Sequence, residues 1–285
     1  MNTEFFRFKL GDFECVSISD GRLVYPIENF FAKVPKEQVE EGLRQYDLPT
    51  DQVVTPYTYL FANTGEQRVL VDMGAGHLAP TTGKLLENMR AAGIEPAEID
   101  TVLITHAHPD HIGGCLDEEG NPIYVNASYY LWKGEWEFWF SESALEKAPE
   151  SFVRMAREKL QPIQERVNLV EDESEILPGI HAMAAPEHTP GHMVVAFASG
   201  KEQLLYIGDT VLHPLHLEHL DWLPIYDILP EKAAASKRRI FDYAADERLW
   251  VIGQHFPPFP SLGHIARQGD GWKWMPVSGT IGSGS

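Results

Sequence analysis

The sequence has few cysteines, fewer basic than acidic residues and no long apolar run. Cys15 and Cys115 are the only cysteines, too few for a disulfide framework. The 23 Lys and Arg residues against 42 Asp and Glu give a formal charge of −19, which disfavours nucleic acids and anionic membranes because both are bound through basic side chains. Without an eighteen-residue apolar stretch or a basic and apolar leader, we expect a cytoplasmic protein with a small-molecule substrate, no nucleic-acid partner and no membrane partner.

The length of 285 residues suits one α/β domain. We find no linker or internal repeat, so we predict a single domain over residues 1–281 with a short tail at 282–285. Residues 25–56 have little regular pattern, and long irregular segments in compact domains are often functional. We expect this segment to act as a lid over the site or to meet a second subunit in a homodimer. A passive surface loop fits its sequence equally well.

Strand-like and helix-like apolar patterns alternate along the chain, which predicts a layered α/β architecture. The expected strands are residues 13–19, 57–63, 68–72, 101–104, 193–198, 204–207 and 249–252. The expected helices are residues 35–44, 82–92, 152–166 and 230–245, the third interrupted or ended near Pro162.

A His-Ala-His-Pro-Asp-His run follows the apolar strand at 101–104. Side chains at i and i+2 share one face of a strand, so His106 and His108 can bind one cation, while Asp110 and His111 can reach a second. Neutral imidazoles and a carboxylate suit zinc, or iron, manganese or cobalt. We therefore predict two divalent metal ions, with zinc as the first choice.

Three later motifs follow or precede apolar runs and can supply the remaining ligands. They are Thr-Pro-Gly-His at 189–192, Gly-Asp-Thr at 208–210 and Gly-Gln-His at 253–255. An aspartate at the end of a strand can bridge two cations with its two carboxylate oxygens, and Asp209 is the candidate for this role.

In this order, the motifs resemble those of the metallo-β-lactamase superfamily. The resemblance begins at residues 70–76 and implies an αβ/βα sandwich, in which two mixed sheets are flanked by helices and a dinuclear metal site lies between the sheet edges. It implies the ligands His106, His108 and His192 for the first metal, Asp110, His111 and His255 for the second, and Asp209 for both. Asp72 matches an aspartate that supports the ligands without binding metal.

The segment 255–264 and the ending 272–277 are most similar to the branch with methyl parathion hydrolase and relatives of the N-acyl homoserine lactone lactonases. In that pattern the first histidine is the ligand, which favours His255 and leaves His264 as a pocket residue. The reverse assignment stays open, because a histidine nine residues further on could reach the same pocket.

The resemblance implies a metal-dependent hydrolase. Two cations about 3.5–4 Å apart can share a hydroxide at neutral pH, and this bridging hydroxide is the expected nucleophile, with Asp110 and Asp209 holding the cations. The expected substrates are lactones, aryl esters or phosphotriesters, as in a quorum-quenching lactonase or an organophosphate hydrolase-like phosphotriesterase. Related lactonases carry Tyr or His three residues after the bridging aspartate, where this chain has Leu212. His213 is therefore the candidate proton donor, with metal-bound water as the alternative.

Three tryptophans are candidate pocket walls. Trp136 and Trp139 share a helical face in an aromatic stretch at 129–140, and Trp222 follows a cluster of histidines. Core packing explains the spacing of Trp136 and Trp139 equally well.

Three other functions stay open. Within the superfamily, these are a mononuclear-iron sulfur dioxygenase and a glyoxalase II-like thioesterase. In a different class, a catalytically inactive, metal-stabilised binding module would retain the fold and lose some ligands. Seven candidate ligands exceed the four that a single zinc uses, and this number favours the dinuclear hydrolase.

Overall fold

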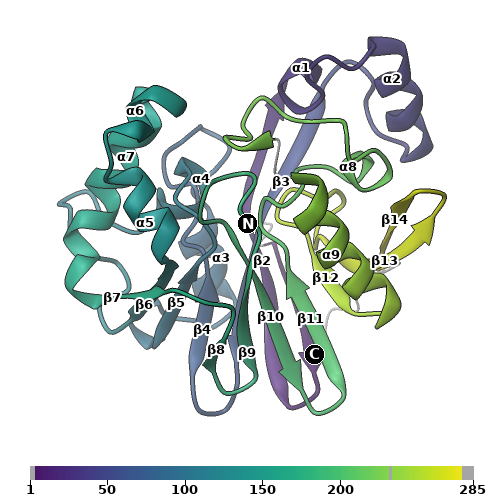
Figure 1. Ribbon diagram of the computed structural model, residues 1–285. Helices are drawn as coiled ribbons and strands as arrows, with labels where there is room; N and C mark the ends of the chain where they lie inside the picture. Colours follow the sequence, from purple (N-terminus) through teal and green to yellow (C-terminus); the bar gives the residue numbers. More distant parts are fainter. Residues whose placement is uncertain (1–3, 231–232, 278–285) are drawn as a thin grey trace.

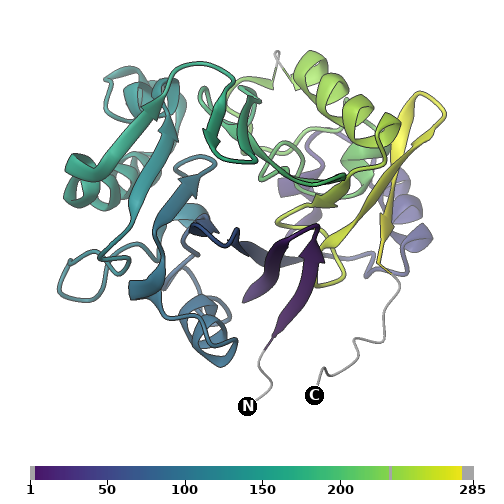
Figure 2. The ribbon, with the colours of Figure 1, turned by 90° about the horizontal axis from the view of Figure 1, so that it is seen from below.

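Two seven-stranded sheets pack face to face in the computed structural model, which describes residues 4–230 and 233–277 (Figures 1 and 2). The first sheet contains β1 (Phe5–Leu10), β2 (Phe13–Tyr25), β3 (Val53–Asn63), β4 (Arg68–Val71), β5 (Thr101–Ile104), β6 (Ser128–Trp132) and β7 (Val167–Val170). The second contains β8 (Glu175–Leu177), β9 (Ile180–Ala184), β10 (Met193–Ser199), β11 (Glu202–Tyr206), β12 (Trp250–Ile252), β13 (Leu262–Gln268) and β14 (Gly271–Pro276). The predicted tail at 282–285 lies outside the described residues.

Both sheets are mixed. Strands β1 to β4 pair antiparallel and β4 to β7 pair parallel. In the second sheet, β11 and β12 are parallel and the other neighbours are antiparallel. Parallel neighbours need long crossover connections, which place helices on the outer faces. The arrangement confirms the predicted sandwich of two mixed sheets flanked by helices.

Helices flank the two sheets (Figure 1). They are α1 (Ile27–Phe30), α2 (Lys36–Gln45), α3 (Leu85–Ala91), α4 (Pro109–Ile112), α5 (Lys133–Trp139), α6 (Ser143–Lys147), α7 (Glu150–Leu160), α8 (Leu215–Glu218) and α9 (Ala233–Asp246), with 3-10 helices at Pro96–Glu98 and Gln161–Arg166. Apolar side chains of α3, α5, α6 and α7 pack on the first sheet, and those of α9 pack on the second. None of the helices within the described residues is long and apolar enough to cross a membrane.

The strands that lead to the candidate site are buried on both faces. Leu103 of β5 packs between the sheets, whereas its neighbours Val102 and Ile104 face the outer helices. Each such buried aliphatic side chain contributes about 1.5–3 kcal/mol to folding. Burial on both faces explains why β5 is apolar at every interior position, and it fixes the strand end from which the histidine-rich run continues.

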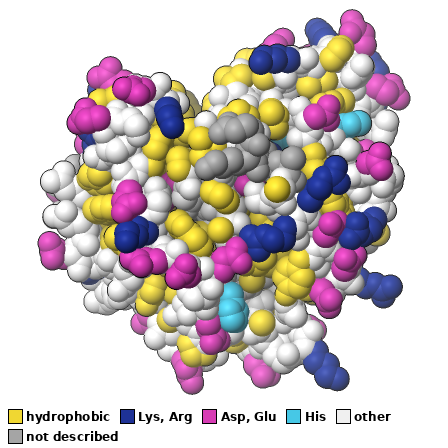
Figure 3. Space-filling model, viewed as in Figure 1, with side chains coloured by type: hydrophobic (Ala, Val, Ile, Leu, Met, Phe, Trp, Pro, Cys, Tyr) yellow, Lys and Arg dark blue, Asp and Glu magenta, His cyan; other side chains and the backbone are white. Residues whose placement is uncertain are grey.

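Most predicted elements are present, with different ends. The helix expected over residues 152–166 is divided: α7 stops at Leu160 and a 3-10 helix continues, because Pro162 cannot donate a hydrogen bond. The helix expected over 230–245 is α9, and residues 231–232 lie outside the described residues. The face drawn in Figure 3 carries acidic side chains across both halves of the molecule, as the net charge of −19 requires.

The segment 25–56 is partly regular, since it contains α1 and α2. Its Phe30 and Phe31 pack with Leu212 and Trp222, which follow β11 in the chain. The segment is therefore tied to the loop after β11, and contact with a second subunit stays a prediction.

Candidate metal centre

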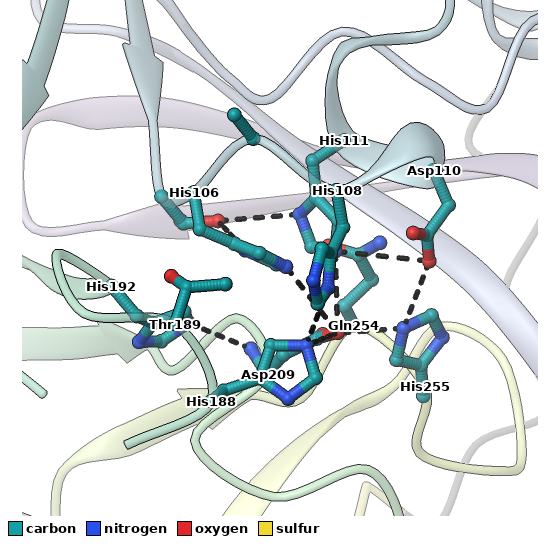
Figure 4. A network of polar contacts seen from close by, with 12 residues as sticks. His106, His108, Asp110, His111, His188, Thr189, His192, Asp209, Gln254 and His255 are labelled. Atoms are coloured by element: carbon teal, nitrogen blue, oxygen red, sulfur yellow. Dashed lines mark hydrogen bonds and ion pairs between the residues drawn. The ribbon is translucent and has the colours of Figure 1, made fainter. Parts of the chain in front are cut away.

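Four chain segments converge at one edge of the sandwich (Figure 4). The first runs from the end of β5 into α4, where Pro109 occupies the first helical turn and the chain turns sharply. The loop between β9 and β10, the end of β11 and the end of β12 bring the other segments to the same point. The edge collects His and Asp side chains that are far apart in the sequence.

The first group joins three histidines and an aspartate. Its members are His106, His108, His188 and Asp209, whose ligand atoms lie within 4.8 Å of one another. His188 Nε2 lies 3.2 Å and His106 Nε2 lies 3.7 Å from Asp209 Oδ2. All four side chains are buried. Three imidazoles with one carboxylate form a four-ligand set of the kind that binds zinc.

The second group shares Asp209 with the first. Its other members are Asp110, His111 and His255, again with ligand atoms within 4.8 Å of one another. His255 Nε2 lies 3.2 Å from Asp209 Oδ1 and 3.3 Å from Asp110 Oδ2. His111 Nε2 lies 3.4 Å from Asp209 Oδ2. Asp209 Oδ1 contacts a histidine of the second group and Oδ2 contacts histidines of both groups, so Asp209 lies between the two candidate cation positions.

His192, a predicted ligand, is not a member of either group, although its ring lies 5.1 Å from that of His106, and its role as a ligand stays a prediction. Its Nε2 accepts the backbone N–H of Asp209 at 3.0 Å, so it braces the shared aspartate. Gly208 permits this close approach, because a Cβ there would lie 2.7 Å from His192 Nε2. His188, four residues earlier in the same loop, belongs to the first group.

The two groups fit divalent metal ions. His106 Nε2, His111 Nε2 and Asp209 Oδ1 are buried without a hydrogen-bond partner among the described residues. Such orphaned atoms are costly unless something binds them. Burial lowers the pKa of His106 well below its ordinary value, which keeps its imidazole in the neutral form that binds metal.

The pKa of His188 also bears on metal binding. Burial lowers its pKa, but hydrogen bonds to the carboxylates of Asp209 and Asp227 outweigh burial and raise the pKa to about 9. The protonated imidazole is therefore favoured at neutral pH, and its Nε2 lies 2.8 Å from His108 Nδ1 and 3.2 Å from Asp209 Oδ2. A metal ion bound to this nitrogen would replace its proton, as expected when metal binding releases protons.

Asp72 supports His111 from behind, at the place the sequence predicts. Its Oδ2 accepts a hydrogen bond from His111 Nδ1 at 2.8 Å, and its Oδ1 accepts one from Thr105 N at 2.8 Å. The Asp72 backbone has φ of 60°, a left-handed conformation that costs energy in a non-glycine residue. The hydrogen bonds hold it there and turn Nε2 of His111 toward Asp209.

Glu135 ties two ligand-bearing loops together, a role that the sequence does not indicate. It is fully buried and accepts hydrogen bonds from Ala107 N at 2.9 Å, Gly191 N at 3.0 Å and Thr189 Oγ1 at 2.6 Å. Trp139 Nε1 donates to the same carboxylate at 2.6 Å. Four donors stabilise the buried group and hold the loop of His106 and His108 against the loop of His188.

Asp227 orients His188 and is also missing from the sequence prediction. Its Oδ1 accepts a hydrogen bond from His188 Nδ1 at 2.8 Å, and Lys237 Nζ lies 3.7 Å from its Oδ2. The side chains of Asp227 and Lys237 are each 2% exposed. A carboxylate behind a histidine fixes the tautomer that directs the other nitrogen toward the metal.

We expect Asp227→Asn to weaken metal binding by about 10- to 100-fold, the range for loss of a partner behind a metal-binding histidine. The amide keeps the shape but removes the charge that holds the His188 proton on Nδ1. Competition with a coloured chelator would measure the affinity. Asp246→Asn, a matched change at an exposed ion pair with Arg267, should leave it unaltered. Equal affinities for both variants would contradict the role of Asp227.

A cavity of about 240 Å³ lies over the two groups. Its lining consists of Leu23, Tyr25, Phe30, Leu78, His108, Pro109, Asp110, Phe152, His188, Asp209, Leu212, Tyr226 and His255. Tyr25 and Phe30 come from the end of β2 and the segment predicted as a lid. The walls are mainly apolar and aromatic, with polar groups gathered at one end, as is typical of small-molecule sites.

The three tryptophans predicted as walls do not line this cavity. Trp136 stacks on Phe140 at 4.4 Å between ring centroids, and Trp222 stacks on His219 at 4.0 Å. Trp139 lies behind the site, with its ring 5.6 Å from that of His108. The spacing that placed Trp136 and Trp139 on one helical face reflects core packing.

Two predicted histidines also lie elsewhere. His264, on β13, stacks on Trp250 and its Nδ1 pairs with the carbonyl of Leu249 at 2.8 Å, so it is not a pocket residue. His213 is buried 5.3 Å from the ring of Phe31, and its Nδ1 accepts the N–H of Leu215. Burial lowers the pKa of His213 well below its ordinary value. It therefore has neither the position nor the proton of the predicted acid.

Comparison with known proteins gives consistent matches. The sequence model of the metallo-beta-lactamase superfamily matches residues 52–267. An N-acyl homoserine lactonase of Bacillus sp. is 22% identical over 194 residues, covering 68% of this chain and 66% of the lactonase, just under two thirds of its length. Among solved structures, AidC, a dizinc quorum-quenching lactonase in complex with its product, is 28% identical with a TM-score of 0.89, covering 97% of this chain and 98% of AidC. The hydrolase AbOPH is 26% identical with a TM-score of 0.90, covering 98% and 99%.

Proposed function

This chain belongs to the metallo-beta-lactamase superfamily, and on this premise we propose that it is a dinuclear metal-dependent hydrolase that opens lactones. One observation carries the proposal: two groups of buried His and Asp atoms share Asp209 beneath a cavity with apolar walls. The similarity to a dizinc lactonase over almost the full length of both chains supports the same activity. Aryl esters and phosphotriesters are further candidate substrates.

The candidate metals are two zinc ions. His106, His108 and His188 would hold one, Asp110, His111 and His255 the other, and Asp209 both. Bound zinc supplies a Lewis acid and lowers the pKa of water toward about 7. Histidine nitrogens and carboxylate oxygens suit zinc, and the similar enzyme AidC is a dizinc protein.

The cavity residues suit an uncharged substrate with an apolar substituent. Phe30, Phe152 and Leu78 present apolar surface, whereas Asp110 and Asp209 lie at the floor. An apolar wall holds an acyl or aryl group and excludes water from the reacting end of the substrate, where electrostatic stabilisation is stronger. The acidic surface of the protein does not attract anionic substrates.

Protein purified without chelator should contain close to two metal ions per chain by elemental analysis. It should hydrolyse acyl homoserine lactones or simple γ-lactones faster than aryl esters and phosphotriesters, and dialysis against a chelator should abolish turnover, because the metal supplies the nucleophile. Re-addition of zinc should restore it.

One metal ion per chain with full activity would contradict the dinuclear site and favour a mononuclear dioxygenase. Two bound metals without hydrolysis of any substrate class would favour a binding module. Preferential hydrolysis of phosphotriesters would agree with a dinuclear hydrolase but contradict lactones as its substrates.

A further inference from the structure

The cavity has no proton donor three residues after Asp209, because Leu212 is apolar, and His213 does not line the cavity. Among the described lining residues outside the two metal groups, the side chains that can donate a proton are Tyr25 and Tyr226. We infer that the phenol of Tyr25 protonates the leaving oxygen during hydrolysis. This inference rests on the proposed function.

Two elements position Tyr25. It is the last residue of β2 and pairs with Val53 at the start of β3, so its backbone belongs to the sheet. Its hydroxyl is hydrogen-bonded to the hydroxyl of Tyr57. Tyr57 is fully buried, and its ring centroid lies 4.9 Å from that of His255 in the second metal group. The Tyr25 hydroxyl is thus held from a rigid strand, next to a residue that packs on a candidate ligand.

The Tyr25 phenol carries its proton at neutral pH. Burial raises its pKa above the ordinary value, and the charge of Asp110 adds to the effect. When Tyr57 is the donor in the hydroxyl pair, the hydrogen of Tyr25 is free to point into the cavity. An aliphatic alkoxide is a stronger base than a phenolate, so it can take this proton. A nitrophenolate is a weaker base and can leave without it.

Tyr226 occupies a different position. It lies in the loop after α8, and its hydroxyl accepts a hydrogen bond from Asn29 Nδ2 at 2.8 Å. Its ring meets that of Tyr25 edge to face at 6.2 Å. The Tyr25 hydroxyl contacts Tyr57, which packs on His255, whereas the Tyr226 hydroxyl bonds to Asn29, so we assign Tyr226 to the cavity wall.

The proposed hydrolysis step accounts for every bond and proton. Hydroxide derived from water forms a bond to the carbonyl carbon, and the bond from that carbon to the leaving oxygen breaks with its electron pair on the oxygen. The proton of Tyr25 moves to that oxygen. The tyrosinate then takes up the proton that the attacking water released, so one lactone and one water give one hydroxy acid.

The test compares leaving groups in the metal-loaded enzyme. Tyr25→Phe should lower kcat/KM for a γ-lactone by about 10²-fold, the lower end for a positioned acid. It should lower kcat/KM for a 4-nitrophenyl ester by no more than about threefold, because that leaving group needs no proton. Tyr226→Phe should change kcat/KM for both substrates by the same factor. Tyr243→Phe, which removes a phenol on α9 that bonds Gln203, should behave as the wild type.

Product binding gives a readout without turnover. Calorimetry should show that Tyr25→Phe binds the ring-opened hydroxy acid about fivefold more weakly, as expected for one lost hydrogen bond. It should bind the acid that lacks the hydroxyl as tightly as the wild type does. Tyr57→Phe keeps the Tyr25 phenol and removes its hydrogen-bond partner. It should therefore lower kcat/KM by a smaller factor, about tenfold, and only for the lactone.

The outcomes separate the two proposals. If the wild type hydrolyses neither substrate, the proposed function fails and the role of Tyr25 fails with it. If the wild type is active and Tyr25→Phe loses both activities equally, or neither, only the role of Tyr25 is overturned. Should Tyr25→Phe lack metal or fold poorly, Tyr57→Phe decides, since a loss without lactone selectivity would contradict the inference.

Discussion

Asp209→Ala is expected to lose both metal ions and to lower hydrolysis by more than about 10³-fold. Asp209 is the residue shared by the two groups, with Oδ1 3.2 Å from His255 Nε2 and Oδ2 3.2 Å from His188 Nε2. Without the metals, attacking water keeps a pKa of about 15.7 instead of about 7, so the nucleophile is almost absent at neutral pH. Elemental analysis and kcat/KM on one preparation would measure both effects.

His264→Ala is the matched control. It removes a histidine that lies outside both groups and stacks on Trp250, so the variant should keep two metals and its kcat/KM. A metal lost from His264→Ala and retained in His255→Ala would reverse the assignment of the late ligand. Full metal content in Asp209→Ala would contradict a shared aspartate.

His188→Ala should retain about one metal ion per chain and lose more than about 10²-fold in activity. The removed imidazole is one of four ligands of the first group and contacts His108 at 2.8 Å. Removal of a residue that hydrogen-bonds to a metal ligand lowers metal affinity or activity by about 10- to 100-fold, and removal of the ligand itself should lower it further. The second group does not include His188, so it should still bind its metal.

His192→Ala is expected to behave differently, although both histidines lie in one loop. It removes the acceptor of the Asp209 backbone N–H, and an unsatisfied buried donor costs about 1–3 kcal/mol. The variant should therefore unfold at a lower temperature but still reach two metals per chain when zinc is in excess. If His192→Ala loses a metal and His188→Ala does not, His192 and not His188 is the ligand of the first metal.

Local spacing was enough to predict the densest part of the site. The His-Ala-His-Pro-Asp-His run places four ligand candidates within six residues directly after the buried strand β5. The turn into α4 then brings Asp110 and His111 to the second group, beside the first. The same reasoning placed Asp209 at the end of β11. Such arguments hold when the side chains concerned belong to one rigid element.

Spacing along the chain did not distinguish the roles of His188 and His192, because a loop sets the directions of both side chains. His188 and His192 both lie between β9 and β10, and both reach the site. Hydrogen bonds from Thr189 and Gly191 to Glu135 shape the loop between them. Glu135 is more than fifty residues away in sequence, so no local pattern could show that His188 contacts the carboxylate of Asp209 and His192 its backbone N–H.

The prediction of His213 as proton donor also depended on the direction of a side chain in a loop. Position 213 follows Asp209 closely, but α8 begins at Leu215 and turns His213 onto Phe31. Leu212 and Tyr25, the latter nearly two hundred residues earlier in the chain, line the cavity, and His213 does not. Nothing in the sequence around Tyr25 marks it, because its position depends on Tyr57 and on the pairing of β2 with β3.

From the sequence alone, the alternation of strand-like and helix-like patterns predicted an α/β architecture, and the His and Asp motifs predicted metal chemistry. The mixed-sheet sandwich followed from the resemblance of those motifs to the metallo-β-lactamase superfamily. Only the tertiary structure showed that His188 contacts the carboxylate of Asp209 and His192 its backbone N–H, and which aromatic side chains line the cavity. It also revealed the supporting carboxylates of Glu135 and Asp227. These features depend on contacts between segments distant in sequence, and the directions of side chains in loops are fixed only when those segments pack.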